Sequence, residues 1–473
     1  MGAVENSTNI ICRDDVGDSN SGLAAVINNG MCIGCGACAV KDERITLKRD
    51  VYGAMQATLP ANDPNISEAV AAVCPFSNSS KNEDQIADEL YRDLSHEPRV
   101  GRYIASYAGR VDQGEDITKS SSGGLTSWIC LELMNAGLID GVIHVGSAGV
   151  DTDGLFEFCV SRSADEVRAR RKSQYYSASF DEVIREVLGD GKRYVLVGVP
   201  CFIKAARLLC SEIPELKNQL VYTVALVCGH MKTSRFAELL AWQLSIPPTD
   251  LAQVDFRVKN PGKSAKSYKF GAKTAIGEWQ THQSSTLVGA NWGHASFQMD
   301  ACDYCDDIFG ETADVALGDA WLDKYTGEWR GTNVLVVRNP IIDKLLQVGK
   351  GDHRLFLEDL PIDELCKSQD GNFRHRHDGL SVRLEDRQKA GLWTPVKRIK
   401  AGSRKVDSTR RKIVRLRQKL AQTSHTAFLQ ARENQNLSFY MNAINPLIKQ
   451  MALLSRGSLF ARVARKLKKI LPF

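Results

Sequence analysis

The sequence has none of the long apolar runs that a membrane-spanning chain needs. No stretch approaches about 18 consecutive apolar residues, and runs such as YTVALVC at 222–228 have the length of a buried strand. The first residues, MGAVENSTNIICRDD, are polar and acidic rather than signal-like. We therefore expect a cytoplasmic protein, and 43% hydrophobic residues in a chain of 473 are enough for a large core.

Two kinds of catalytic motif are missing as well. No G-x-G-x-x-G follows a strand-like run, so the sequence does not support a Rossmann dinucleotide site. No Ser-His-Asp set and no paired carboxylates stand out, so nothing indicates hydrolysis. Aromatic residues make up only 7% of the chain. They are too sparse in its C-terminal part to stack on bases, so we expect no nucleic-acid partner.

Cysteine, in contrast, is abundant, with an odd total of 13. Disulfide frameworks belong mainly to small exported proteins, and this chain is long and begins with no signal-like segment. Clustered thiols in such a chain usually bind metal.

The densest cluster is GMCIGCGACAVKD at 30–42, which contains Cys32, Cys35 and Cys38. The C-x2-C-x2-C spacing with small intervening residues is typical of iron-sulfur proteins, whereas zinc favours two separated C-x2-C pairs. A two-cluster ferredoxin has a fourth cysteine where this chain has Asp42. We therefore expect Cys74, in AAVCPFS, to complete one 4Fe-4S cluster. A zinc knuckle and unliganded thiols are the alternatives.

Four more cysteines are dispersed along the chain. Cys302 and Cys305 form a C-x2-C pair, which alone could be half a zinc site or a redox dithiol. Cys201 and Cys228 each follow an apolar, strand-like run. Because open α/β sheets build their sites at the carboxyl ends of parallel strands, these two positions are also candidate ligands.

The middle of the chain alternates between strand-like and helix-like segments. We expect strands at 141–146 and 221–227, another in RYVLVGV before Pro200, and a further strand at 254–260. This alternation predicts an α/β fold with a largely parallel sheet.

A serine- and glycine-rich segment precedes the helix expected after residue 124. It consists of Ser121, Ser122, Gly123 and Gly124. Such a segment at a helix N-terminus can bind a phosphate through free N–H groups and the helix dipole. An ordinary N-cap is the alternative, because serine is common before helices.

Six segments follow one another along the chain: SSGGLTS, RKSQYYS (171–177), VGVPCFIKAARLL (197–209), CGHMKT (228–233), CDYC (302–305) and ADVALGDAWL with GTNVLVVRN (313–339). In this order they resemble the family of coenzyme F420 hydrogenase/dehydrogenase beta subunits. The resemblance covers roughly residues 20–350. It implies a flavin-binding α/β core that moves electrons between iron-sulfur clusters and a substrate or deazaflavin.

The resemblance also implies roles for particular residues. It makes Cys201, Cys228, Cys302 and Cys305 a second 4Fe-4S site. It makes Ser121, Ser122, Gly123, Gly124, Lys172, Ser173 and Tyr175 contacts of FAD. Lys172 would neutralise the pyrophosphate and Tyr175 would contact the isoalloxazine. His230 would supply a proton to the flavin or, alternatively, bond a backbone carbonyl or a cluster sulfur.

One departure from the family concerns the electron donor. The archaeal hydrogenase members lack a ferredoxin-like N-terminal segment, which this chain has, so we expect an external donor such as ferredoxin. Related bacterial proteins occur beside polysaccharide-synthesis proteins, which suggests a small-molecule or glycan-precursor substrate. The alternative to an oxidoreductase is a non-catalytic, metal-stabilised scaffold with a basic tail that binds a membrane or a partner.

We expect five regions along the chain. They are a ferredoxin-like segment (20–85), a flavin-binding domain (98–180), a domain with the second iron-sulfur site (185–350), an extension (351–401) and a basic helical tail (402–473). The tail carries 16 Lys/Arg against two acids, while the whole chain has a net charge of +5. Near its end Leu459, Phe460, Val463, Leu467, Ile470 and Leu471 share one helical face.

That pattern is typical of a helix lying on anionic lipid, which would place the protein at the inner face of the membrane. The alternative is a helix that docks on the body of the protein or on a partner.

Overall fold

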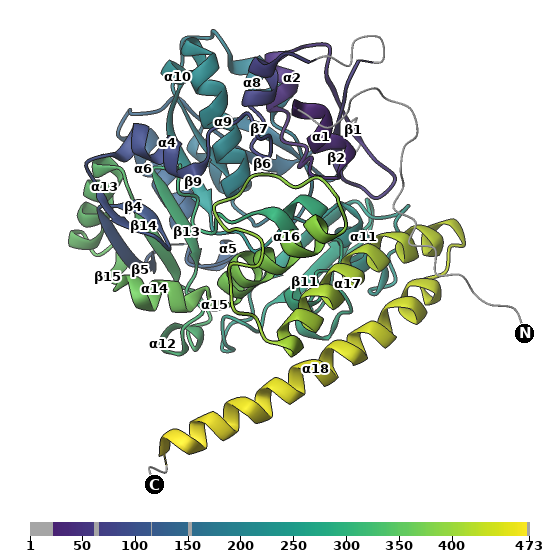
Figure 1. The fold of residues 1–473 in the computed structure, drawn as a ribbon. Helices are drawn as coiled ribbons and strands as arrows, with labels where there is room; N and C mark the ends of the chain where they lie inside the picture. The colour runs from purple at the N-terminus through teal and green to yellow at the C-terminus, as the bar shows by residue number, and fades with distance from the viewer. Residues whose placement is uncertain (1–21, 61–65, 115, 150–153, 471–473) are drawn as a thin grey trace, which may run out of the picture.

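The computed structural model describes residues 22–60, 66–114, 116–149 and 154–470, without the side-chain surroundings of Asp116 and of residues 456–470. An eight-stranded sheet forms the centre of the body (Figure 1). Its strands are β5 (Ala105–Val111), β6 (Gly141–Ser147), β7 (Phe156–Ser161), β8 (Tyr194–Gly198), β9 (Leu220–Leu226), β13 (Val315–Asp319), β14 (Asn333–Val337) and β15 (Leu355–Asp359). Their order is β15-β5-β14-β13-β9-β8-β6-β7.

The four central strands β6, β8, β9 and β13 run parallel, while β7 and β14 pair antiparallel with their neighbours. β5 pairs antiparallel with β14 and β15 pairs antiparallel with β5, so these two strands continue the sheet to its edge. The predicted α/β class is therefore confirmed, but the expected parallel pairing holds only for the centre of the sheet. The strands predicted at 141–146 and 221–227 correspond to β6 and β9.

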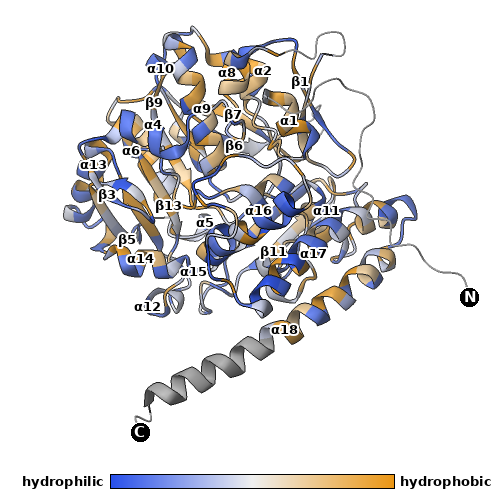
Figure 2. Ribbon diagram, viewed as in Figure 1, coloured by the Kyte–Doolittle hydropathy of each residue, from blue (hydrophilic) through white to orange (hydrophobic). Residues whose placement is uncertain are grey.

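Helices cover both faces of this sheet. They are α6 (Leu125–Asn135) and α13 (Pro340–Gly351) on one face, and α8 (Asp181–Val187) and α9 (Pro200–Glu212) on the other. On the first face Ile129 and Leu346 belong to one buried cluster with Val195 of β8. On the second face Ile203 packs with Leu196. Neighbouring residues of β8 thus pack into opposite layers, because side chains alternate along a strand. Figure 2 shows hydrophobic strands between the two helical layers.

The sheet joins the two domains expected at 98–180 and 185–350. β5, β6 and β7 come from the first range and β8, β9, β13 and β14 from the second. β15, from the expected extension, forms one edge. The expected boundary therefore separates two stretches of chain within a single sheet.

The N-terminal segment folds around a small core of its own. Its elements are α1 (Gly22–Asn28), α2 (Ala37–Lys41), β1 (Thr46–Arg49), β2 (Met55–Thr58) and α3 (Glu68–Ala72). The strands β1 and β2 form an antiparallel hairpin, and Leu23, Ile45 and Val70 are buried beside Cys38. These elements fall within the expected ferredoxin-like segment. α4 (Glu83–Tyr91), opened by a capping box between Asn82 and Gln85, and the hairpin of β3 (Ser95–Glu97) and β4 (Gly101–Tyr103) follow it.

A second, antiparallel sheet lies beside the first. It consists of β10 (Gln253–Val258), β11 (Lys269–Lys273) and β12 (Gln280–Gln283). The strand predicted at 254–260 is β10 and so belongs to this smaller sheet. α11 (Arg235–Trp242) packs on it, and the rings of Phe236 and Phe256 stack at 5.8 Å.

Short helices connect these parts. They are α5 (Asp116–Lys119), α7 (Ala164–Ala169), α10 (Pro214–Gln219), α12 (Asp323–Thr326), η1 (Ser284–Thr286), η2 (Trp292–His294) and η3 (Asp300–Tyr304). After β15 come α14 (Ile362–Ser368), α15 (Asp370–Phe373), the π-helical turn η4 (Arg374–Gly379) and α16 (Leu380–Lys389).

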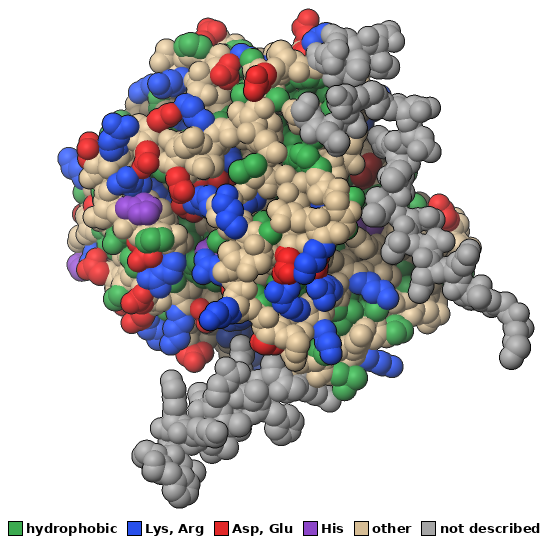
Figure 3. Space-filling model, viewed as in Figure 1, with side chains coloured by type: hydrophobic (Ala, Val, Ile, Leu, Met, Phe, Trp, Pro, Cys, Tyr) green, Lys and Arg blue, Asp and Glu red, His purple; other side chains and the backbone are tan. Residues whose placement is uncertain are grey.

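Two long helices end the chain, α17 (Ser408–Glu433) and α18 (Ser438–Ile470). Leu420 and Phe428 of α17 and Tyr440 and Ile444 of α18 are buried in one cluster with Phe297, so α17 and the first part of α18 dock on the body. Lys and Arg side chains gather over α16 and α17 (Figure 3). The predicted apolar face at 459–471 lies outside the described side chains. No helix in the described part of the chain is long and apolar enough to cross a membrane.

Candidate functional site

The cysteines predicted to bind the first cluster come together in the N-terminal segment. Cys32 and Cys35 lie on the loop that leads into α2, Cys38 lies in the first turn of α2, and Cys74 follows α3. The four thiols lie close enough together that a charge on one raises the pKa of another. Cys35 and Cys38 are buried, while Cys32 and Cys74 are partly exposed.

Two glycines let the loop fold tightly around these thiols. Gly34 and Gly36 both have left-handed backbone conformations, with φ of 64° and 91°. A Cβ at Gly34 would stand 2.4 Å from the carbonyl oxygen of Met55, and one at Gly36 would stand 2.4 Å from Ser179 Oγ. Any other residue would therefore meet both backbone strain and a clash at these positions.

Backbone N–H groups point at the sulfur atoms of this set. The amides of Gly34 and Ala57 donate to Cys32 Sγ at 3.4 and 3.5 Å. Burial raises the pKa of the Cys74 thiol to about 11, and hydrogen bonds from the backbone of Phe76 and Ser77 oppose that shift. Such donors stabilise a thiolate and are one of the means by which proteins tune bound iron-sulfur clusters. The donor set therefore fits the expected 4Fe-4S cluster.

The four dispersed cysteines also come together. Cys201 lies in the first turn of α9 directly after β8, and Cys228 lies just after β9, so the prediction that both follow parallel strands is confirmed. Cys302 lies on η3, and Cys305 follows it. All four line one small cavity of about 10 Å³. In the described part of the chain no three His, Cys, Asp or Glu side chains form a site for a single metal ion.

A buried arginine, which the sequence did not reveal, faces the second set. Arg376 of η4 donates from Nη1 to Cys305 Sγ and to the carbonyl oxygen of Asp307, the latter at 3.0 Å. Its Nη2 donates to the carbonyl oxygen of Gly229 at 3.2 Å. The Met231 amide donates to Cys302 Sγ at 3.2 Å. A cation and an N–H group at the sulfurs suit a negatively charged cluster.

The two sets of thiols and a large cavity adjoin one another. Ile33, next to Cys32, and Phe76, two residues after Cys74, line the small cavity of the second set. Cys228 and Met231 line both that cavity and a larger one of about 590 Å³. The first set, the second set and the large cavity therefore lie in series.

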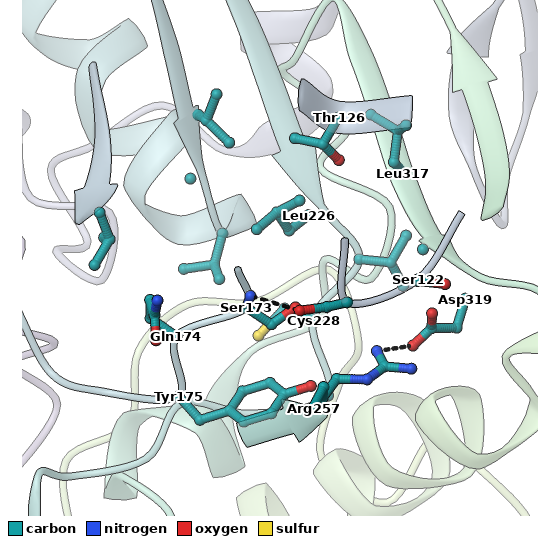
Figure 4. A pocket seen from close by; sticks show the side chains of 18 of the residues that line it. Ser122, Thr126, Ser173, Gln174, Tyr175, Leu226, Cys228, Arg257, Leu317 and Asp319 are labelled. Carbon is teal, nitrogen blue, oxygen red and sulfur yellow. Dashed lines mark hydrogen bonds and ion pairs between the residues drawn. The ribbon is translucent and has the colours of Figure 1, made fainter. Parts of the chain in front are cut away.

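The large cavity is polar at its serine-rich wall (Figure 4). Ser121 Oγ accepts a hydrogen bond from the Ser173 amide at 2.9 Å. Ser120 Oγ, Ser122 Oγ and Gln174 Oε1 are buried without a hydrogen-bond partner, although all three side chains line the cavity. Unpaired polar atoms at a cavity wall are the positions that a polar cofactor would satisfy.

The serine hydroxyls do not cap α6. Its N-cap residue is Gly124, with no side-chain cap, and Asn333 Oδ1 instead accepts from the Leu125 amide at 3.3 Å. The N-cap alternative therefore does not describe the serines. Gly123 is not among the cavity-lining residues, and a Cβ there would stand 2.6 Å from Asn333 Oδ1. The absence of a side chain at Gly123 therefore lets this segment pack closely against β14.

Lys172 and Tyr175 both line the cavity but have protein partners. Lys172 Nζ forms an ion pair with Asp255 Oδ2 at 2.9 Å. The ring of Tyr175 meets those of Phe256 and Trp292 edge to face at 5.3 and 4.9 Å. The aromatic group around Tyr175 therefore includes Trp292 of η2, which is distant along the chain and which the sequence did not indicate.

Arg257, which is buried, and Asp319, which is partly exposed, form an ion pair in the same cavity (Figure 4). Arg257 Nη1 donates to Asp319 Oδ2 at 2.8 Å, while its Nε is buried and unpaired. Arg257 also lies over the ring of Tyr268 at 4.9 Å. Asp319, at the end of β13, therefore holds a cation in the cavity wall.

Two regions of the chain match family models. Residues 106–185 match the N-terminal part, and residues 191–362 the C-terminal part, of the coenzyme F420 hydrogenase/dehydrogenase beta subunit. The chain belongs to this family. The resemblance predicted from the six sequence segments is therefore confirmed, and the chain is an oxidoreductase by family.

Two relatives show how far the similarity extends. One component of the F420H2 dehydrogenase of Methanosarcina mazei is 23% identical over 348 residues, which cover 72% of this chain and 88% of that protein. A chain in the F420-reducing [NiFe] hydrogenase complex of Methanosarcina barkeri is 16% identical, with a TM-score of 0.48. The match covers 64% of this chain and 99% of that one.

Several site residues lie outside the regions that match the family models. The first thiol set precedes residue 106, whereas His375 and Arg376 on η4 and Arg417 on α17 follow residue 362. His375 and Arg417 line the large cavity. No local spacing in the sequence marks these three residues. Arg417 in particular could not be distinguished from the other basic residues of the tail.

His230, the predicted proton donor, lies where the second set meets the cavity and is 5% exposed. Its ring packs 4.5 Å from that of Trp292. Burial, and then the charges of Lys232, Arg417 and Arg376, lower the pKa of His230 well below its usual value. Its Nε2 bonds neither a carbonyl nor a sulfur in the described part of the protein.

Proposed function

We propose that this family member is a reductase that binds two 4Fe-4S clusters and FAD and reduces a small-molecule or glycan-precursor substrate in the large cavity. The serial placement of the two thiol sets and the cavity, joined by Cys228 and Met231, carries the proposal. When bound, the clusters supply one-electron transfer and the flavin couples it to two-electron chemistry.

The chain's own residues have distinct tasks in this proposal. Cys32, Cys35, Cys38 and Cys74 hold the first cluster, and Cys201, Cys228, Cys302 and Cys305 hold the second. The unpaired hydroxyls of Ser120 and Ser122 bind polar groups of FAD. Arg257, fixed by Asp319, neutralises its phosphate charge. Tyr175 and Trp292 enclose its ring system.

The first set suits an external electron donor such as ferredoxin. Cys32 and Cys74 of the first set are partly exposed, whereas in the second set Cys201 is partly exposed and Cys228, Cys302 and Cys305 are buried. A donor protein can therefore approach the first cluster more closely than the second. Protein partners are also in keeping with a family of beta subunits.

Anaerobic purification tests the proposal. We expect a brown protein with about eight iron and eight sulfide per chain, as two 4Fe-4S clusters require, together with FAD. Zinc in a colourless protein without flavin would contradict it.

Replacing Cys74 with serine is expected to make the first cluster oxygen-labile or to convert it to a 3Fe-4S form, because one iron loses its thiolate. Electron paramagnetic resonance of the anaerobic variant measures this change. Cys210→Ser, on α9 and away from both sets, is the matched control and should leave the spectrum unchanged. An unaltered spectrum and iron content in Cys74→Ser would exclude Cys74 as a ligand.

The tail leads to a separate prediction about attachment to the inner face of the membrane. Because Arg417 and the packed part of α18 belong to the body, the informative truncation is after Leu454 rather than before α17. The intact chain should bind anionic liposomes at low salt and dissociate from them at high salt. Each basic residue near the liposome surface contributes roughly 1 kcal/mol to binding, and salt screens this attraction. The truncated chain should keep its iron and flavin but not bind. An intact chain that ignores such liposomes would exclude this attachment.

A further inference from the structure

The wall of the large cavity near the second thiol set contains buried nitrogen atoms that make no hydrogen bond in the described structure. They are His230 Nε2, His375 Nε2 and Arg417 Nε. All three side chains line the cavity, and His230 and His375 are 5% and 3% exposed. The three come from the loop after β9, from η4 and from α17, so only the tertiary fold brings them together.

These groups form one cluster of nitrogen donors around the Arg417 guanidinium. The rings of His230 and His375 lie 6.4 Å apart. Arg417 acts electrostatically on both rings, and Lys232 acts on His230. Lys232 Nζ lies 4.9 Å from the centre of the Trp292 ring, so the cluster adjoins the aromatic pair of Trp292 and Tyr175.

The hydrogen-bond pattern shows that His375 offers a donor. The guanidinium of Arg383 lies 3.5 Å from His375 Nδ1, and because an arginine can only donate, Nδ1 accepts and the proton of the neutral ring is on Nε2. A carboxylate oxygen of Asp303 lies 3.9 Å from Nε2, which is beyond hydrogen-bond distance.

Asp303 is the acid that acts on Arg417, but its carboxylate is shared with Arg383 Nε at 3.6 Å and does not line the cavity. Asp319 is the one acid among the described cavity-lining residues, and it is bonded to Arg257 at 2.8 Å. Arg417 Nη2 and Lys232 Nζ donate to uncharged oxygens, those of Gln298 Oε1 and the Ser296 carbonyl. Buried donors and cations without acceptors are unfavourable, and oxygens of a bound anion would remove that cost.

We propose that His230, Lys232, His375 and Arg417 form a subsite for an oxyanionic group of the substrate, such as a carboxylate or a phosphate. This inference rests on the proposed function in assigning the anion to the substrate and not to FAD. The subsite holds the acid group beside the aromatic pair, so the remainder of the substrate lies against the ring system enclosed there. It selects acidic substrates over neutral ones of the same shape. His375 and Arg417 lie beyond residue 362, so the selectivity comes from outside the family-matched regions.

Calorimetric titration of the flavin-loaded holoprotein with acetate and with inorganic phosphate tests the subsite. We expect saturable binding of at least one of the two anions. Arg417→Gln and His375→Ala should each weaken it tenfold or more at unchanged flavin and iron content. Lys412→Gln, an exposed residue of the same helix, is the matched control and should bind as the unaltered protein does. Arg417→Lys, which keeps the charge, should bind more tightly than Arg417→Gln and guards against an effect of misfolding.

Equal anion binding in Arg417→Gln and in the unaltered protein would overturn the inference, as would the absence of binding by both anions. Loss of flavin in parallel with loss of anion binding would also overturn it, because the cations would then serve the cofactor. A protein that purifies without flavin would instead contradict the proposed function, and the same titration would still show whether the anion subsite exists.

Discussion

Replacement of both Cys302 and Cys305 by alanine is expected to remove about half of the bound iron and to abolish reduction of the flavin by a one-electron donor. The reason is that the second cluster loses two of its four ligands, while the four cysteines of the first set are unchanged and Cys38 is held by a core of its own with Leu23 and Val70. Iron analysis and electron paramagnetic resonance measure the loss, and the signal of the first cluster should persist. Flavin content should remain, because its expected contacts lie on other elements.

The control for this experiment is a double variant of equal chemistry, Cys210→Ala with Cys366→Ala. Both residues are buried but belong to neither set, so iron and flavin should be unchanged. Unaltered iron in the Cys302 and Cys305 variant would exclude both residues as ligands. Complete loss of iron, with the thermal unfolding of the protein unchanged, would indicate one shared site.

Replacement of Arg376 by glutamine is expected to lower the reduction potential of the second cluster. The Arg376 guanidinium donates to Cys305 Sγ and is 2% exposed, so its charge is poorly screened and stabilises the more negative, reduced cluster. We expect at least a tenfold change in the ratio of reduced to oxidised cluster at a given potential, which is about 59 mV for a one-electron couple. A redox titration monitored by electron paramagnetic resonance gives the value.

Two further variants make this result interpretable. Arg376→Lys keeps a positive charge but not the planar geometry. The potential of its second cluster should therefore lie between that of the unaltered protein and that of Arg376→Gln. Arg374→Gln changes an arginine of the same turn whose side chain is 43% exposed, and it should leave the potential unaltered. A potential in Arg376→Gln equal to that of the unaltered protein would show that the arginine only fills space.

The sequence predicted the parts of the site that local spacing defines. The C-x2-C-x2-C pattern of Cys32, Cys35 and Cys38 places three thiols around one expected cluster within seven residues of chain. Cys201 and Cys228 could be placed at strand ends, because β8 and β9 are short apolar runs followed by a change in pattern. Their assembly with Cys302 and Cys305 depended on the family resemblance.

Pairing between distant strands was harder to predict. The sequence indicated strands but not their partners, so the antiparallel edges formed by β7, β14, β5 and β15 were missed. The strand predicted at 254–260 formed, but in the smaller sheet. Strand direction depends on which apolar faces meet in the folded core, and this information is not contained in any one segment.

The sequence by itself determined the class of the fold, the family and the first group of thiols, because periodicity, ordered short segments and close spacings are local properties of the chain. Only the tertiary structure decided that Arg376 faces the second set and that Arg417, in the basic helical tail, lines the cavity with His375. The physical reason is that the role of a charged side chain depends on its burial and its partners. Those partners are supplied by segments far away along the chain.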